Sequence, residues 1–244
     1  LSLHLLGFRF NRINASNQLQ MDSYNNPWKL ASFGELDDLK KLVEAGVKID
    51  ESDERGFTPL AWAARNAHIP VLQYLVEQGC SKESFSFGGM RPLHHACNKN
   101  NEKAIRLLLK AGAEVNSVDE NGDSSLHYAS ARGVLNIVVA LLEAGANSRV
   151  ANCQGVTPLH KAALFGQLAV VRRLLAESNT DKNAKDAAGD TALHYAARCG
   201  YPTVTKLLIE SDASASIKNG DGKVAKEVAQ TTAIAQLFDV TPAV

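Results

Sequence analysis

Apolar and polar positions recur along this chain in blocks of ten residues that are near copies of one another. The blocks are TPLAWAARNA from residue 58, RPLHHACNKN from 91, SSLHYASARG from 124, TPLHKAALFG from 157 and TALHYAARCG from 191. Their starting positions are separated by 33, 33, 33 and 34 residues. A fixed period of this length is typical of a repeat array in which each repeat is one supersecondary unit.

Each block predicts a short helix that begins at its first residues and ends near its tenth. Thr58 and Thr157 can accept an N-cap hydrogen bond, and a proline such as Pro158 suits the first helical position. Gly133 and Gly166 fall where a left-handed residue ends a helix. A turn is therefore expected after each block.

A second apolar pattern with helical spacing follows the blocks, at 71–79, 104–112, 136–145 and 169–178. Each unit also contains a polar stretch that suits a tight turn: DERG at 53–56, DENG at 119–122, NCQG at 152–155 and DAAG at 186–189. One unit is thus predicted to be a helix, a turn, a second helix and a protruding loop. Because one helix pair buries too little apolar surface to be stable alone, several pairs must stack.

The motif Thr-Pro-Leu-His-x-Ala-Ala-x-x-Gly at this period resembles the ankyrin repeat. The resemblance covers about residues 25–238 and implies an all-α solenoid of about seven helix-turn-helix units with protruding hairpin loops. Residues 1–24 are expected to be a flexible tail, either native or left over from upstream of the natural start. The single repeat domain expected at 25–244 consists of a capping unit at 25–57, repeats at 58–90, 91–123, 124–156, 157–190 and 191–223, and a C-terminal cap at 224–240.

Local departures from the motif predict altered loop shapes without a change of fold. The stretch FSFGGM at 85–90 lacks the usual Asp before its glycine, and Asn100 stands at a helix-ending glycine position. Ala61 replaces the histidine of the motif, and one extra residue lies within 176–183.

The charge balance and the cysteines narrow the class of partner and the compartment. The 26 Lys and Arg residues match the 26 Asp and Glu residues, so no global basic field exists to hold nucleic acid or an anionic membrane surface. The four cysteines show neither CxxC spacing nor the density of a disulfide scaffold, which favours reduced thiols in the cytoplasm or the nucleus. No run of about 18 apolar residues predicts a membrane span.

One histidine per repeat invites comparison with a metal site. His94, His127, His160 and His194 occupy the same position of successive units. Stacked helices lie about 8–10 Å apart, whereas zinc holds all its ligands at about 2.0–2.3 Å, so these side chains cannot share an ion. We predict that they donate to loop backbone instead. Neither a cofactor nor a metal is expected, and the chain lacks the motifs of a nucleophile elbow or a dinucleotide site.

In the ankyrin family, partners are bound by the loop tips and by the exposed side of each first helix, which together line a concave groove. Carried over to this sequence, the resemblance implies partner-binding roles for Arg55, Phe57, Trp62, Arg65, Phe87, Met90, His95, Lys99, Asp123, Tyr128, Arg132, Lys161, Leu164, Phe165, Tyr195 and Arg198. The large apolar members favour protein binding, because exposed apolar anchors carry most interface energy. In the alternative interpretation, Trp62 and Tyr128 are half-buried packing and Phe87 only folds its own loop.

The resemblance therefore predicts a monomeric, non-enzymatic scaffold or adaptor that binds another, unidentified protein and no small-molecule substrate. Two narrower hypotheses stay open. The number of units is similar to that of a proteasome-assembly chaperone of the same family, and the chain could instead be the regulatory segment of a larger enzyme or channel.

Overall fold

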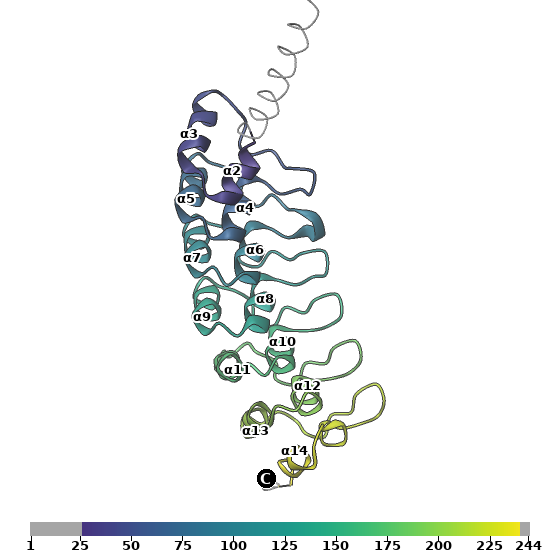
Figure 1. Cartoon of the computed structure of the whole chain (residues 1–244). Helices are drawn as coiled ribbons and strands as arrows, with labels where there is room; N and C mark the ends of the chain where they lie inside the picture. The colour runs from purple at the N-terminus through teal and green to yellow at the C-terminus, as the bar shows by residue number, and fades with distance from the viewer. Residues whose placement is uncertain (1–25, 240–244) are drawn as a thin grey trace, which may run out of the picture.

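The computed structural model describes residues 26–239, which form a stack of short helices (Figure 1). The predicted tail at 1–24 and residue 240 of the predicted C-terminal cap lie outside the described residues. The helices are α2 (Pro27–Phe33), α3 (Leu36–Glu44), α4 (Pro59–Asn66), α5 (Ile69–Glu77), α6 (Pro92–Asn98), α7 (Glu102–Lys110), α8 (Ser125–Arg132), α9 (Leu135–Glu143), α10 (Pro158–Leu164), α11 (Leu168–Leu175), α12 (Ala192–Arg198), α13 (Pro202–Glu210) and α14 (Thr232–Gln236), with 3₁₀ turns η1 (Phe87–Gly89) and η2 (Ala225–Val228).

The helices are arranged in two columns. The first helices of the pairs, α2, α4, α6, α8, α10 and α12, contact one another in sequence, and the second helices form a parallel column beside them (Figure 1). Loops project together from the side of the first helices. Within residues 26–239 these six pairs and the final η2–α14 segment confirm the predicted all-α solenoid of about seven units.

The residues that were expected to start and end the first helices do so. The Thr58 hydroxyl accepts a hydrogen bond from the Ala61 amide at 3.2 Å, and Pro59 follows at the first helical position. Gly133 ends α8 in the left-handed region with φ 77°. These local bonds satisfy amide and carbonyl groups that a short helix leaves unpaired at its ends.

The core is a stripe of leucines shared between neighbouring units. One leucine of each first helix is almost fully inaccessible to solvent, and these are Leu60, Leu93, Leu126, Leu159 and Leu193. Ala162 and Ala163 are fully buried where α10 packs against α8 and α12, so small side chains allow the close approach of the helices. At the C-terminal end Lys226 occupies the leucine position and is exposed, as a cap that faces water requires.

The departures from the motif change local loop geometry and leave the fold intact. In the 85–90 stretch Ser86 stands in place of the usual Asp, yet its amide still donates to the Met90 carbonyl and its carbonyl accepts from Gly89, both at 2.9 Å. The Ser86 hydroxyl also donates to the Met90 carbonyl at 3.1 Å. The expected change of loop shape is nevertheless present, because this loop forms the 3₁₀ turn η1 and has positive φ at both Gly88 and Gly89. The extra residue within 176–183 lies in the loop after α11 and leaves the following helix pair unchanged.

Two first helices end on a residue that is unfavourable for the conformation it adopts. Ala67 and Asn100 both have φ 60°, at the position where Gly133 and Gly166 stand in later units. The left-handed conformation costs an L-residue about 1–2 kcal/mol, and asparagine tolerates it better than alanine. Ala67 is thus a point of local strain.

Replacing Ala67 with glycine is expected to stabilise the fold. The relief of strain exceeds the added chain entropy of the unfolded state, which leaves a gain of about 0.5–1 kcal/mol in the free energy of unfolding. The reciprocal control is Gly145→Ala, since Gly145 has φ 88° and a Cβ there would meet no atom within 4 Å. We expect it to lose about 1 kcal/mol through backbone strain alone. Urea denaturation would measure both, and an A67G variant less stable than the parent would contradict the interpretation.

Candidate protein-binding face

The loops and the exposed sides of the first helices form one continuous surface, which we call the loop face. Its loops are 53–57, 86–90, 119–123, 152–156, 186–190 and 219–223. In the 119–123 loop, Asp119 Oδ1 accepts from the amides of Asn121 and Asp123, each at 2.9 Å. The same pair of bonds recurs at Asp53, Asn152, Asp186 and Asn219. The first residue of each of these loops therefore closes its own turn.

Neighbouring loops are joined to each other by one backbone hydrogen bond at each step. The amides of Phe87, Glu120, Cys153, Ala187 and Gly220 donate to the carbonyls of Arg55, Gly88, Asn121, Gln154 and Ala188 at 2.7–3.0 Å. Gly122 illustrates why these turns need a glycine. Its φ is 77°, and a Cβ there would lie only 2.9 Å from the backbone nitrogen of Cys153. The loops therefore form a connected ladder instead of independent flaps.

The aromatic residues predicted on the first helices are hydrogen-bonded to the loops. The Trp62 indole N–H donates to Asp53 Oδ2 at 2.9 Å, and the Tyr128 hydroxyl donates to Asp119 Oδ2 at 2.6 Å. Tyr195 makes the same bond to Asp186 at 2.7 Å. Burial, followed by the bond to the carboxylate, raises the pKa of Tyr128. These half-buried rings brace the loops, as the packing interpretation of Trp62 and Tyr128 predicts.

Phe57 and His95 were expected to be exposed, and this expectation is wrong. Phe57 is only 8% exposed, because its ring stacks on Trp62 with 4.4 Å between centroids and lies 4.6 Å from the ring of His95. His95 Nε2 in turn lies 2.7 Å from the Ser86 hydroxyl. Burial lowers the pKa of His95 to about 3, so the ring is neutral. The Arg65 guanidinium lies 5.7 Å from the centre of the Phe57 ring.

Asp123 was also predicted to face a partner and is instead buried. Its carboxylate accepts from the side-chain amide of Asn152 in the next loop at 2.8 Å and from Lys161 Nζ of α10 at 3.0 Å. Asp190 accepts from Arg198 in the same repeat position. Burial raises the pKa of Asp190, but the bonds from Arg198 and Asn219 outweigh burial and leave it lowered. The charges of Lys161 and Arg198 are therefore balanced within the fold.

The remaining predicted residues differ in how far they reach solvent. Phe87 is 88% exposed and Phe165 is 50% exposed. An exposure of 88% is incompatible with the alternative that Phe87 packs into its own loop. Arg55, Lys99 and Arg132 are exposed, whereas Arg65, Met90 and Leu164 are partly buried.

Two further exposed apolar residues on this part of the chain were missed in the sequence. Val118 is 42% exposed one repeat after Phe85, which is 67% exposed, so adjacent loops both carry apolar side chains. Phe33 at the end of α2 is 64% exposed. The 33-residue period between Phe85 and Val118 could have identified the pair. Phe33 lies in the unit that was considered only as a cap.

The repeated histidines make the backbone contacts that were predicted. The Nε2 atoms of His94, His127, His160 and His194 lie 2.9–3.2 Å from the carbonyl oxygens of Ser117, Val156, Asp190 and Lys223 respectively. Nδ1 of each ring accepts from the amide that precedes its helix. Burial lowers the pKa of His94, His127 and His160, which favours neutral rings.

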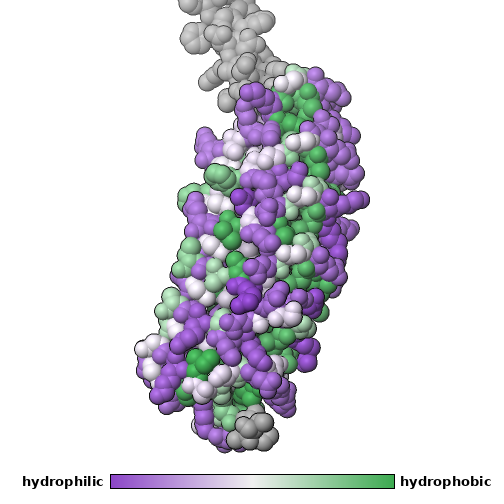
Figure 2. Space-filling view, turned by 180° about the vertical axis from the view of Figure 1, so that it is seen from behind, coloured by the Kyte–Doolittle hydropathy of each residue, from purple (hydrophilic) through white to green (hydrophobic). Residues whose placement is uncertain are grey.

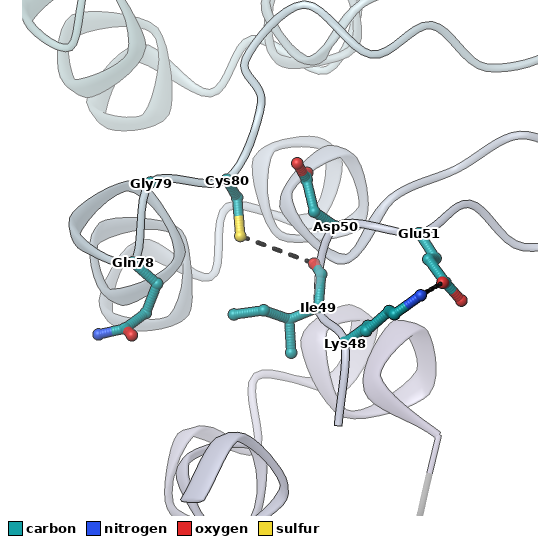
Figure 3. Close-up of a pocket in the computed structure, with 7 residues that line it drawn as sticks. All are labelled: Lys48, Ile49, Asp50, Glu51, Gln78, Gly79 and Cys80. Atoms are coloured by element: carbon teal, nitrogen blue, oxygen red, sulfur yellow. Dashed lines mark hydrogen bonds and ion pairs between the residues drawn. The ribbon is translucent and has the colours of Figure 1, made fainter. Parts of the chain in front are cut away.

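Two features of the described residues bear on metal and thiol chemistry. In the 26–239 range, no group of three or more His, Cys, Asp or Glu side chains is placed to hold a metal ion. An open pocket between the first two units contains Cys80, whose thiol donates to the Ile49 carbonyl at 3.6 Å (Figure 3). Burial raises the pKa of Cys80 to about 11, so this thiol is not a reactive thiolate.

Figure 2 shows the hydropathy of the side of the molecule opposite to the view of Figure 1. A lengthwise band of hydrophobic surface runs along one side, and smaller hydrophobic patches lie among hydrophilic residues elsewhere (Figure 2). Val76, Leu109 and Leu142 of the second helices are partly buried and packed on the core. Among the described helices, none has the length and hydrophobicity that crossing a membrane requires.

Comparison with known proteins agrees with the repeat geometry. The family model for ankyrin repeats, which spans three copies, matches residues 28–119 and again 126–221. The ankyrin-repeat domain of human ASB11 is 27% identical with a TM-score of 0.79, and the alignment covers 89% of this chain and 99% of that one. The ankyrin-repeat domain of Bcl-3, described as a unique member of the IkappaB family, is 26% identical with a TM-score of 0.77 and coverages of 87% and 97%.

The neutral buried histidines predict a loss of stability in mild acid. Their pKa values in the folded state lie below the unfolded value of about 6.5, so the unfolded chain binds protons first as the pH falls. Stability should be constant above about pH 7 and decrease below about pH 6.5. His127→Ala should cost about 2–4 kcal/mol and make the remaining profile shallower. Urea denaturation between pH 7.5 and 5 measures both effects, and a profile of unchanged slope in the variant would contradict this role.

Proposed function

Because this chain belongs to the ankyrin-repeat family, whose domains generally bind other proteins, we propose that its loop face is a non-enzymatic binding site for a protein partner. The observation that carries the proposal is Phe87, a large apolar side chain that is 88% exposed on a loop fixed by backbone hydrogen bonds. A partner that covers this side chain removes apolar surface from water, and this burial favours binding.

The apolar residues near Phe87 support this assignment. Phe85 on the same loop and Val118 on the next are also exposed, which gives adjacent loops a shared apolar character. Exposed apolar groups that cluster on a surface usually mark an interaction site, and aromatic anchors contribute most of the binding energy. Phe165 at the end of α10 extends the candidate site toward the C-terminal units.

The hydrogen-bonded loops also favour tight binding from a small number of anchors. Association costs about 0.5–1.5 kcal/mol for each mobile side chain that must be ordered, in addition to any loop ordering. On this face Trp62, Tyr128 and Tyr195 already hold their loops through bonds to Asp53, Asp119 and Asp186. Little of the binding energy is therefore spent on ordering the site.

We also propose that the protein is a monomer, that it binds neither nucleic acid nor membranes nor small molecules, and that it acts in the cytoplasm or nucleus. Its equal numbers of acidic and basic residues favour a protein over a polyanion. A narrower hypothesis is a proteasome-assembly chaperone role, which rests on the similar number of units alone. Regulation of a larger enzyme or channel is the other hypothesis, and a longer reading frame would support it.

Removing the exposed anchors should abolish partner capture without unfolding the chain. A variant with Phe87→Ser and Phe165→Ser is expected to lose at least about 90% of the partner that the parent chain retains, since an anchor contributes about 2 kcal/mol or more. Quantitative affinity capture from lysate, with equal thermal unfolding as a check, measures this loss. Leu135→Ser is the matched control, because Leu135 is 37% exposed but starts the second helix α9. Equal loss in the control, or none in the anchor variant, would contradict the assignment.

A further inference from the structure

Beyond α2, the first helices and the residues that directly end them carry five Lys or Arg side chains, of which two are paired with carboxylates and three are not. Lys161 and Arg198 are paired with Asp123 and Asp190, at 3.0 Å and 2.7 Å. Arg65, Lys99 and Arg132 come from three consecutive first helices, and within the described chain none of these three is paired with a carboxylate. A row of unbalanced positive charge therefore lies along α4, α6 and α8.

The carboxylates at the bases of the loops form no ion pair with these three residues. Asp53 and Asp119 each use one oxygen for two loop amides and the other for Trp62 or Tyr128. Asp123 is shared by Asn152 and Lys161. Other exposed carboxylates, Glu54 and Glu120, lie at the tips of loops and not on the helices. Lys161 and Arg198 therefore have carboxylate partners, whereas Arg65, Lys99 and Arg132 have none among the described residues.

The three cations are placed to act together. Helices α4, α6 and α8 are consecutive neighbours in the column, and the Arg132 guanidinium donates to Asn98 of α6 at 2.6 Å. Lys99 is the residue after Asn98, so the charges of Arg132 and Lys99 lie on neighbouring ends of two helices. Lys99 and Arg132 stand at the same repeat position, and Arg65 stands one position earlier in its unit. Packed helices are about 8–10 Å apart, which sets the approximate spacing of these residues along the column.

From this arrangement we infer that the partner contacts the loop face through an acidic segment whose carboxylates are about 10 Å apart, opposite Arg65, Lys99 and Arg132. The inference rests on the proposed function and specifies the chemistry of the partner. An extended chain advances about 3.3 Å per residue and would carry a carboxylate at every third position. A helical segment advances 1.5 Å per residue and would carry one at every seventh.

Apolar side chains of the same segment complete the match. Phe165 follows Lys99 and Arg132 at the corresponding place of the next unit, so the charged row continues into an exposed aromatic ring. The face therefore selects a segment that is acidic toward α4–α8 and apolar toward α10. Complementary charge of this kind orients the partner and speeds association more than it adds affinity.

The test uses a phage-displayed library of random 12-residue peptides as the probe. It is panned against three forms of the chain: the parent, the Lys99→Glu/Arg132→Glu variant, and the Lys103→Glu/Lys110→Glu control. The control makes the same change in net charge on exposed positions of α7, a second helix. Thermal unfolding establishes that all three fold alike.

The parent and the α7 control are expected to select peptides enriched in Asp and Glu at spacings of three or seven. Binding of the most enriched peptide should fall at least about tenfold in the K99E/R132E variant, which corresponds to about 1.4 kcal/mol. It should also weaken in the parent as salt is raised from about 0.05 to 0.5 M, because exposed charge pairs are screened.

Other outcomes separate this inference from the proposed function. One such outcome is the selection of apolar peptides that bind the parent and the K99E/R132E variant equally well but do not bind the Phe87→Ser/Phe165→Ser variant. That outcome would overturn the acidic partner and would still support the loop face as the binding site. Peptides whose binding is unchanged in every loop-face variant would overturn both the acidic partner and the loop face as the binding site. A selection with no enrichment over an uncoated surface would also count against both. Equal loss in the α7 control would mean that net charge, and not this row, attracts the peptides.

Discussion

The hydrogen bond from each repeated histidine to the loop ahead of the next helix is the contact on which the rest of the architecture depends. His127 illustrates it: one ring nitrogen accepts from Ser124 at the start of its own helix, and the other lies 2.9 Å from the Val156 carbonyl in the loop that precedes α10. A single buried ring thus fixes the beginning of one helix and the end of one loop. Because burial keeps the ring neutral, it can serve as acceptor and donor at once.

Loops fixed at their bases can then be joined at their tips. The Cys153 amide reaches the Asn121 carbonyl only because Gly122 lacks a Cβ, and the same approach recurs along the array. Side chains from the first helices complete the support by donating to the loop carboxylates. The outcome is a face whose shape is determined before any partner arrives, which is the condition under which a few exposed anchors suffice for binding.

Much of this could be predicted from sequence because it depends on contacts that repeat with the period. The helix starts, the leucine stripe and the histidine bonds each need only a residue and its equivalent one unit away. Burial of Phe57 could not be predicted in this way, since it depends on a stack with Trp62 and with His95, which replaces the Tyr seen at Tyr128. Asp123 was misplaced for a similar reason, because its partners Asn152 and Lys161 are not present together in every unit.

The same network determines how charge is distributed over the loop face. A chain with 26 residues of each sign could present a balanced surface, yet the loop-base carboxylates of Asp53 and Asp119 form no ion pair with a basic residue of the described chain. Asp53 and Asp119 bind loop amides and the side chains of Trp62 and Tyr128, whereas Arg65, Lys99 and Arg132 have no carboxylate partner among the described residues. Acidic and basic groups are thus separated on the loop face, and zero net charge of the whole chain does not imply that every part of the binding site is neutral.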